Sequence, residues 1–541
     1  MKRKLRSARA EVQRFLVSAE TSAALDKEAI TQWGFNSYAL VEAAGRECAR
    51  VFHDAFPHLF RDSPRIAVAA GPGNNGADAM VMLRYWILSG ELPPSSAILV
   101  LGRAPETGYS DPNAELINSL KKLKVPVHVW EGEAAGGMGR SSPEIFAQSA
   151  IIVDGISGTG LKGPARGTAL ELINAVNSCS FLARPFVVSV DIPSGNFDGW
   201  KNGMPIIKAD CTLSIEPGKY CVYKPVARPY AGTIVPVRGI FPPELTEACE
   251  KAELLDWESA RKRIPKINPN VYKTERGVVE IWAGSQGATG AAFIAARGAQ
   301  AAGAGLVRLI TDDNIYPILA SQVSGVMVIP SGQAENSNLS HKPGAILLGP
   351  GWGLGPARKV ILEKAMEKEK LGTALILDAD AIILAKGMVF SGNTILTPHP
   401  GEFSKFTGVA LDELLSDPLP VITEYAGKCN ALILFKGHVL FIATPDGKLG
   451  VIDGMTPALA TGGSGDLLAG ICAAIASRMV KEKEAFNAYA CAAAAASLLI
   501  ESGRARGLRA RFADPLEIAD RAADLAGAAW LDDTEEKHDR F

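Results

Sequence analysis

The chain has 541 residues, enough for two to four domains of ordinary size. Its 56 lysines and arginines nearly balance its 58 aspartates and glutamates, so the overall charge gives no reason to expect a nucleic acid or an acidic membrane as a partner. Eight cysteines are scattered without a C-x-x-C pair, which argues against a zinc ribbon or a disulfide scaffold and favours a reducing cytoplasm.

Two stretches bear on membrane contact. The basic start, MKRKLRSARA, is not followed by the apolar segment of a secretory signal, so we expect a solvated tail. The alanine-rich stretch from Ala488 to Ile500 is shorter than the roughly 18–20 residues of a membrane span, so we expect a buried helix there and no membrane partner.

The first half alternates apolar, valine- and isoleucine-rich runs with helix-like segments. The runs cover 65–70, 96–101, 149–154, 185–191 and 232–238, and the clearest helices cover 76–89 and 167–178. This alternation predicts a parallel sheet covered by helices.

The stretch 240–270 is rich in prolines and charges and lacks strand-like runs, so we place a linker at 241–264 between domains at 15–240 and 265–541. A second series then begins. Its expected strands are 277–283, 306–310, 325–329, 344–349, 374–378, 394–397 and 431–435, and its expected helices are 289–302, 465–478, 484–502 and 515–526. No repeat relates the halves, so we expect two unrelated α/β domains.

Three loops of the first half suggest a ligand site. GPGNNGAD (71–78) joins a strand to a helix, as in sheets that present backbone N–H groups to phosphates, although it is neither G-x-G-x-x-G nor a Walker loop. Two later strands end in Asp154 and Asp191, followed by small residues, at the edge where parallel sheets bind ligands. The alternatives are a tight turn with asparagine in left-handed geometry and aspartates that only cap helices.

In this order and spacing, GPGNNG, VDGISGTGLKGP and VDIPSG resemble the NAD(P)H-hydrate epimerase domain, also called the YjeF N-terminal domain. The segment 18–45 resembles its two starting helices. The resemblance covers about 15–240 and implies a Rossmann-like three-layer sandwich with K⁺ bound by Asn75, Asp154 and Ser194, oxygen ligands that suit a hard cation. It also implies substrate contacts from Asn74, Asn75, Gly76, Ala77, Asp78, Gly158, Thr159, Gly160, Leu161, Lys162, Gly163, Pro164 and Asp191.

The family's loop usually reads GPGNNGGDG, so Ala77 and Ala79 stand where it has glycines. A positive φ at Ala77 would cost roughly 1 kcal/mol and crowd the substrate. Carbon C6 of a hydrated nicotinamide is a hemiaminal centre, which inverts by reversible loss of a substituent. Asp191 or Asp154 would shuttle the proton, and we expect Asp191 to be catalytic.

The strongest motif of the second half is LATGGSGDLLAG (459–470), a glycine loop that opens a helix. Backbone N–H groups of 463–465 would form an anion hole for a transferring phosphoryl group, and Asp466 would deprotonate an attacking hydroxyl. The alternative is a helix cap with a glycine turn.

Four further loops follow apolar strands, namely GPGWG (349–353), DADA (378–381), TPHPGEF (397–403) and KGH (436–438). His399 alone would suggest a packed histidine, but Glu402 and two prolines beside it favour a site residue.

Together with the glycine- and alanine-rich segment 283–309, these loops look like the ADP- or ATP-dependent NAD(P)H-hydrate dehydratase of the ribokinase-like superfamily, over about 262–505. The resemblance implies a ribokinase-like three-layer domain and Mg²⁺ with the nucleotide. It implies substrate contacts from Ala291, Gly353, His399 and Asp466, and nucleotide contacts from Lys436, Gly437, His438, Val439, Leu440 and Gly465. The family usually has a tyrosine near Ala288, so an aromatic wall is missing.

The resemblance therefore implies epimerisation of R and S NADHX and NADPHX in the first half and their ADP-dependent dehydration in the second. We expect a cytoplasmic homo-oligomer whose partners are NADHX, NADPHX and ADP or ATP. The alternatives are a small-molecule kinase with a non-catalytic first domain, and a nucleotide sensor. A kinase would leave a stable phosphate ester as its product.

Overall fold

The computed structural model describes residues 15–105, 109, 111–130, 142–179, 184–247, 252–266, 270–334, 341–481, 486–505 and 512–538. The basic first ten residues and Cys249 lie outside this part. Two compact units divide between Glu253 and Leu254. The segment around this point contains α8 (Pro243–Glu247), β10 (Ala252–Leu254) and α9 (Trp257–Arg261), so the expectation that it lacks a strand was wrong.

Unit 1, the part up to Glu253, contains a seven-stranded sheet in which every neighbouring pair is parallel. Its order is β4-β3-β2-β5-β6-β7-β9. The strands are β2 (Ile66–Ala70), β3 (Ala97–Leu101), β4 (Val127–Val129), β5 (Ile151–Gly155), β6 (Phe186–Val190), β7 (Cys211–Ile215) and β9 (Thr233–Val237). The five predicted strands are confirmed, whereas β4 and β7 were missed.

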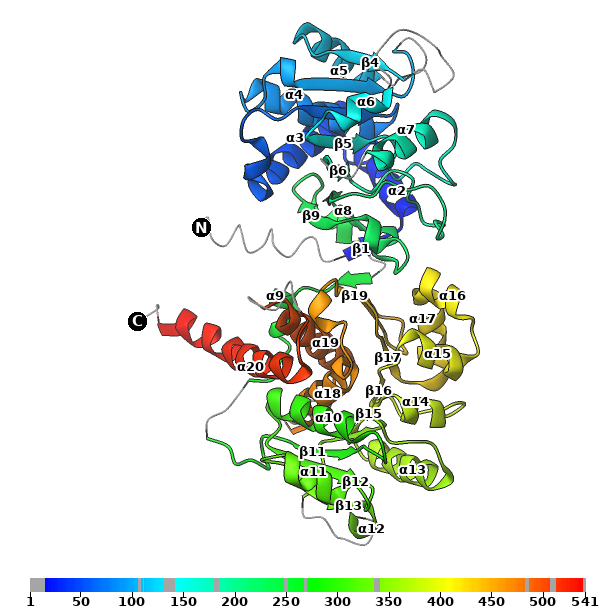
Figure 1. Cartoon of the computed structure of the whole chain (residues 1–541), viewed down its shortest axis with the longest axis vertical. Coiled ribbons are helices and arrows are strands. Elements are labelled where there is room, and N and C mark those ends of the chain that lie inside the picture. The colour runs from blue at the N-terminus through cyan, green and yellow to red at the C-terminus, as the bar shows by residue number, and fades with distance from the viewer. Residues whose placement is uncertain are drawn as a thin grey trace. The chain divides into compact units, whose positions relative to one another are not determined.

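Helices cover both faces of this sheet (Figure 1). Alternate residues of β2 enter different cores: Ile66 and Val68 belong to one, and Ala67 to the other, as the two-residue period of a strand requires. The first core includes α3 (Ser37–Ala55), α4 (Asn74–Leu88) and α5 (Asp111–Lys122), and the second includes α6 (Ser142–Ala147) and α7 (Gly167–Ser178). Ser18 caps α2 (Ala19–Thr31). A short ribbon pairs β1 (Phe15–Val17) with β8 (Gly218–Lys219) and β10.

Unit 2 begins at Leu254, and its strand order is β13-β12-β11-β14-β15-β16-β17-β18-β19. Pairs from β13 to β17 are parallel, and the last two are antiparallel. The strands are β11 (Val278–Trp282), β12 (Leu306–Thr311), β13 (Met327–Pro330), β14 (Ala345–Leu348), β15 (Ala374–Leu377), β16 (Thr394–Leu396), β17 (Leu432–Phe435), β18 (Val439–Ala443) and β19 (Leu449–Asp453). The seven predicted strands are confirmed, and the β18–β19 hairpin was missed.

Helices again lie on both faces of this sheet, which confirms the predicted two-domain α/β class (Figure 1). One face carries α10 (Thr289–Ala301), α18 (Ser464–Lys481), α19 (Ala488–Arg504) and α20 (Pro515–His538), and the other carries α13 (Pro356–Lys370), α14 (Asp380–Leu384), α15 (Pro400–Thr407), α16 (Leu411–Ser416) and α17 (Pro418–Cys429). The shorter helices α11 (Tyr316–Gln322) and α12 (Ser331–Ala334) complete the unit.

Close packing of α10 against α18 fixes the start of α18. A Cβ on Gly470 would lie 2.0 Å from the Ala295 carbonyl oxygen, and one on Gly298 would lie 2.5 Å from that of Leu467, so only glycine fits at either place. The helix α19 is buried in the same core, as expected of the stretch from Ala488. In the described ranges, no helix is both long and apolar enough to cross a bilayer.

Two candidate active sites

In unit 1, glycines let the loop after β2 contact the loop after β5. A Cβ on Gly71 would lie 1.9 Å from the Ile156 carbonyl oxygen, and one on Gly76 would lie 2.1 Å from that of Gly71. Helix α4 begins at Asn74 directly after this contact. The motif GPGNNGAD is therefore a close turn followed by the first turn of a helix.

The two alanines of this motif are compatible with that geometry. Ala77 lies inside α4 and has no positive φ, so the condition under which its methyl group would be strained is not met. A Cβ on Gly155 would lie 2.6 Å from that of Ala79, so the Ala79 methyl group packs against this glycine. Both alanines are fully buried.

The three residues predicted to hold K⁺ belong to one hydrogen-bonded cluster. The Asp154 carboxylate is fully buried and accepts from Ser189 Oγ at 2.7 Å and from the Ser194 backbone N–H at 2.9 Å. Asn75 Nδ2 and Ser194 Oγ both donate to the Ser157 carbonyl oxygen, at 2.9 and 3.0 Å. Burial raises the pKa of Asp154, and the hydrogen bonds from Ser194 and Ser189 oppose that rise.

A cavity of about 610 Å³ opens beside this cluster. Its charged lining includes Asp26, Asp78, Asp191 and Lys219. Lys219 Nζ lies 2.5 Å from Asp191 Oδ1 and donates to the Ile215 carbonyl oxygen at 2.9 Å. Asp191 has a φ of 65°, a left-handed conformation that is uncommon for a residue with a side chain and is often found at functional sites.

Most substrate residues predicted for unit 1 line this cavity. They are Asn74, Asn75, Gly76, Asp78, Gly158, Thr159, Gly160, Leu161 and Asp191. Ala77, Lys162, Gly163 and Pro164 do not line it, and neither do Asp154 and Ser194. Of the two proposed proton carriers, only Asp191 therefore has direct access to a ligand in the cavity.

In unit 2, the glycine loop leads into α18. Gly463 has a φ of 93°, and a Cβ there would lie 2.5 Å from Ile294 Cδ1, so glycine is required. Asp466 lies in the first turn of α18. Burial and the neighbouring Asp378 raise its pKa to about 7, against the opposing effect of Lys436.

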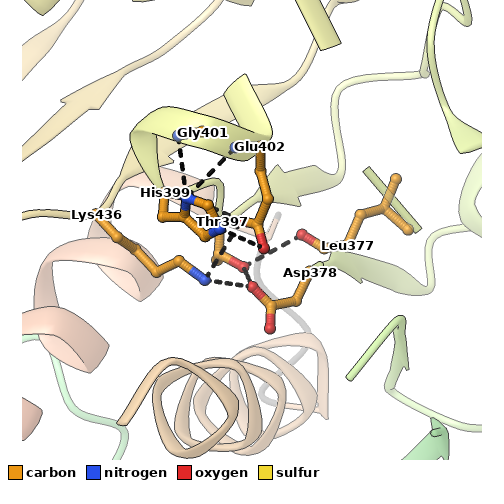
Figure 2. A network of polar contacts seen from close by, with 7 residues as sticks. All are labelled: Leu377, Asp378, Thr397, His399, Gly401, Glu402 and Lys436. Atoms are coloured by element: carbon orange, nitrogen blue, oxygen red, sulfur yellow. Dashed lines mark hydrogen bonds and ion pairs between the residues drawn. The ribbon is translucent and has the colours of Figure 1, made fainter. Parts of the chain in front are cut away.

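Lys436 connects the loops that follow three strands (Figure 2). Its Nζ lies 2.6 Å from Asp378 Oδ1 and 3.9 Å from Glu402 Oε2, while Thr397 Oγ1 donates to the same Asp378 oxygen at 2.7 Å. The Nζ atom also lies 3.3 Å from the position of a Cβ on Gly465. Burial lowers the pKa of Lys436, but attraction to Asp378 and Glu402 outweighs this effect and raises it overall.

His399 has a structural role that its motif did not reveal (Figure 2). Its Nδ1 accepts from the backbone N–H groups of Gly401 and Glu402 at 3.0 and 3.3 Å, and Glu402 Oε2 accepts from the His399 N–H at 2.8 Å. This reciprocal pair forms a capping box at the start of α15. The His399 side chain is 55% exposed and also lines the neighbouring cavity.

That cavity has a volume of about 530 Å³. The predicted residues that line it are His399, Lys436, Gly437, His438, Leu440, Gly465 and Asp466. Val439 is buried in the sheet, and Ala291 and Gly353 do not line the cavity. Gly353 ends the GPGWG loop, and its N–H donates to Asp380 Oδ2 at 2.7 Å. Ala291, on α10, lies beside the same loop, because a Cβ on Gly351 would be 3.0 Å from that of Ala291.

Comparisons with known proteins match both units. Residues 279–513 match a family model described as NAD(P)H-hydrate dehydratase, and residues 37–221 match one described as YjeF-related protein N-terminus. The bifunctional NAD(P)H-hydrate repair enzyme Nnr of Gloeobacter violaceus is 31% identical over 464 residues, covering 81% of this chain and 84% of that protein. The protein of the same name from Thermofilum pendens is 30% identical, covering 83% and 85%.

The chain belongs to the family of bifunctional NAD(P)H-hydrate repair enzymes. A solved ADP/ATP-dependent NAD(P)H-hydrate dehydratase from Bacillus subtilis, co-crystallised with ATP and Mg²⁺, is 26% identical and covers 51% of this chain and 98% of that one, with a TM-score of 0.44.

In this member of the repair-enzyme family, sequence reasoning missed several cavity residues. Asp26 on α2 and Lys219 on β8 belong to no motif, and Asp26 precedes the matched segment 37–221. In unit 2 the missed residues form an apolar wall, composed of Leu459, Leu468, Leu499 and Ile500. The last two belong to α19, whose alanine-rich sequence indicates burial but not which side chains border a cavity.

Proposed function

We propose that this repair enzyme epimerises hydrated NADH and NADPH in unit 1 and dehydrates the S epimer in unit 2, using ADP or ATP. One observation carries the proposal. Asp466, with a pKa of about 7, shares a cavity with Lys436 and the glycine loop that begins α18. A general base of that pKa is suited to a reaction near neutral pH.

The parts of the unit 2 cavity fit a phosphoryl donor. Backbone N–H groups at the start of α18 face an anion favourably, and Lys436 lies against Gly465 in this first turn. The apolar wall formed by Leu459, Leu468, Leu499 and Ile500 provides a surface for a nucleobase. We therefore place the phosphates at the glycine loop and the base at this wall.

The chemistry follows from this arrangement. Hydroxide is a poor leaving group, so the C6 hydroxyl is first phosphorylated. Asp466 takes its proton, and the oxygen attacks the terminal phosphorus of ADP and releases AMP. The ring nitrogen then donates its lone pair, the C6–O bond breaks, phosphate leaves, and C5 loses a proton. The products are NAD(P)H, AMP and phosphate.

Two ions complete the proposal. Mg²⁺ would enter unit 2 with the nucleotide and neutralise phosphate charge, and Asp378 and Glu402, which line the cavity, offer the carboxylate oxygens that it prefers. In unit 1, Asn75, Asp154 and Ser194 would hold K⁺, and the Ser157 carbonyl, which accepts from Asn75 and Ser194, supplies a further hard oxygen.

A single assay tests both activities. Hydrated NADH of mixed stereochemistry is incubated with the full chain, ADP, Mg²⁺ and K⁺, and the absorbance of reduced nicotinamide is followed. We expect complete recovery in one phase, because unit 1 converts the unused epimer, and a slow second phase in Asp191→Ala. A stable phosphate ester without recovered absorbance would establish a small-molecule kinase instead.

We also propose that the enzyme works in the cytoplasm as a homo-oligomer. The described cysteines are all free, which fits a reducing compartment. Light scattering coupled to size-exclusion chromatography would measure the mass in solution, and a mass of one chain, 57.1 kDa, would contradict the oligomer.

A further inference from the structure

Asp78 is an unusual member of the unit 1 cavity lining. Only 7% of the residue is exposed, and its Oδ1 has no hydrogen-bond partner among the described residues. An ionised carboxylate with a buried, unpaired oxygen is costly, whereas a neutral carboxyl group tolerates such a position far better. The residue therefore fits a protonated acid beside the space available to a ligand.

The surroundings of Asp78 favour the same state. The titratable and charged groups facing it are Asp26 from α2, Cys48 from α3, Asp191 after β6 and Lys219 on β8. Lys219 is the one cation among three carboxylates in this group, and it is ion-paired to Asp191. Burial, Asp191 and Asp26 raise the pKa of Asp78 well above its usual value, and Lys219 opposes this only in part.

We propose that Asp78 is the acid of the epimerase, and that Asp191, ion-paired to Lys219, is the base that works with it. This assignment rests on the proposed epimerase function of unit 1 and goes beyond a substrate contact for Asp78. Two carboxyl groups in one cavity but in different environments have the division of roles that acid–base catalysis requires.

Inversion at C6 takes place by loss and addition of water. Asp78 donates its proton to the C6 hydroxyl, the C6–O bond breaks with its electron pair, and water leaves as the ring nitrogen forms a C6=N1 iminium. A water molecule then adds to the opposite face of C6, forming a new C–O bond, and its proton passes to Asp191. The pair holds one proton before and after the inversion and none at the iminium stage, and exchange with solvent returns the proton from Asp191 to Asp78. The C6 oxygen is replaced in each inversion.

Oxygen exchange therefore tests the proposal directly. One epimer of hydrated NADH is incubated with the full chain and K⁺ in ¹⁸O-labelled water, without nucleotide so that dehydration is silent. We expect one ¹⁸O atom per inverted molecule, above the uncatalysed background. Inversion without labelling would show that the ring opens at the C6–N1 bond instead, and would overturn the proposal.

Substitution provides a second test. We expect Asp78→Asn to lower the epimerisation rate at least about 100-fold, the usual contribution of an acid. The matched control, Asp54→Asn on the exposed part of α3, should invert the substrate at the unsubstituted rate. Thermal unfolding of the substituted chain, followed by circular dichroism, reports whether unit 1 is folded. Asp78→Asn epimerising at the full rate would overturn the assignment.

A pH profile distinguishes an acid from a structural residue. Because the protonated form is active, epimerisation by the unsubstituted chain should decline as pH rises through the pKa of Asp78. This readout and the ¹⁸O experiment remain decisive if the Asn variant fails to fold. If the unsubstituted chain does not epimerise at all, the proposed function of unit 1 fails; if it epimerises with no alkaline decline, only the role of Asp78 fails.

Discussion

Each cavity contains a lysine among carboxylates, but the two lysines have different surroundings. Lys219 is ion-paired to Asp191 and also donates to the Ile215 carbonyl, so its contacts lie within the wall of unit 1. Lys436 pairs with Asp378 and also lies 3.3 Å from a Cβ position on Gly465, in the first turn of α18. A lysine at a helix N-terminus can bind a phosphate. Lys219, enclosed by a carboxylate and a carbonyl, instead holds the Asp191 side chain in place.

The carboxylates differ in a related way. Burial raises the pKa of Asp78 well above its usual value, with no partner for one of its oxygens. The pKa of Asp466 is raised only to about 7, because the positive charge of Lys436 partly offsets the effects of burial and of the neighbouring Asp378. Unit 1 thus has a group suited to giving a proton at neutral pH, and unit 2 has one suited to taking it. The following predictions test this contrast.

The largest effect is expected at Asp466. Asp466→Asn should slow dehydration of the S epimer by roughly 10²–10⁴, because it removes the base while keeping the backbone N–H groups of the loop. Nucleotide affinity, measured by isothermal titration calorimetry, should change little. The rate is read from reduced-nicotinamide absorbance, and turnover at the unsubstituted rate would contradict the role of Asp466.

The two lysines should give reciprocal results. Lys436→Met should weaken nucleotide binding by roughly 10- to 100-fold, through loss of a charge-assisted contact, and leave epimerisation unchanged. Lys219→Met should slow epimerisation and leave nucleotide affinity unchanged. Lys386→Met, at an exposed position of unit 2, is the matched control. A variant that lost nucleotide affinity and epimerisation to the same degree would contradict the separate roles of the two lysines.

These contrasts depend on features that the sequence shows only in part. Apolar runs identified the central strands of both sheets, because short Val- and Ile-rich segments between turns are typical of strands that are buried on both faces. The β18–β19 hairpin was missed although Pro445, Asp446 and Gly447, between its two strands, are a recognisable turn signal. Short strands such as β4, with three residues, present too little periodicity.

The sites were predictable where a glycine motif marks a loop, and not where a side chain arrives from elsewhere. The exact start of α4 decided the conformation of Ala77, and a sequence does not specify such a boundary to one residue. Lys219 reaches Asp191 through the pairing of β8 with β1, residues more than 200 positions apart. Asp26 lies on α2, outside every motif that indicates chemistry.

The pH dependence of dehydration gives a smaller effect than either substitution. The base must be ionised, and the pKa of Asp466 is about 7. The rate at saturating nucleotide should therefore rise about tenfold per pH unit below that value and level off above it. Epimerisation should show the opposite slope. Stopped-flow absorbance measures the dehydration profile, the ratio of the epimers over time gives the epimerisation profile, and a shared slope would contradict the acid and base assignments.

The smallest expected effect is on stability. Burial raises the pKa of Asp466 from 3.8 to about 7, so the folded chain binds more protons than the unfolded chain between these values. Stability is then lost as pH rises through this window, and the loss is complete above pH 7. Asp466→Asn carries no charge and should be more stable than the unsubstituted protein above pH 7, by roughly 1–3 kcal/mol after allowance for partial exposure. Below pH 4 the two proteins should unfold alike.

Calorimetry of the nucleotide-free chains at pH 4 and pH 8 measures the difference, and an Asn variant less stable at pH 8 would show that the carboxylate stabilises the fold. Asp466 would then be a structural anion rather than a base kept at a cost to stability.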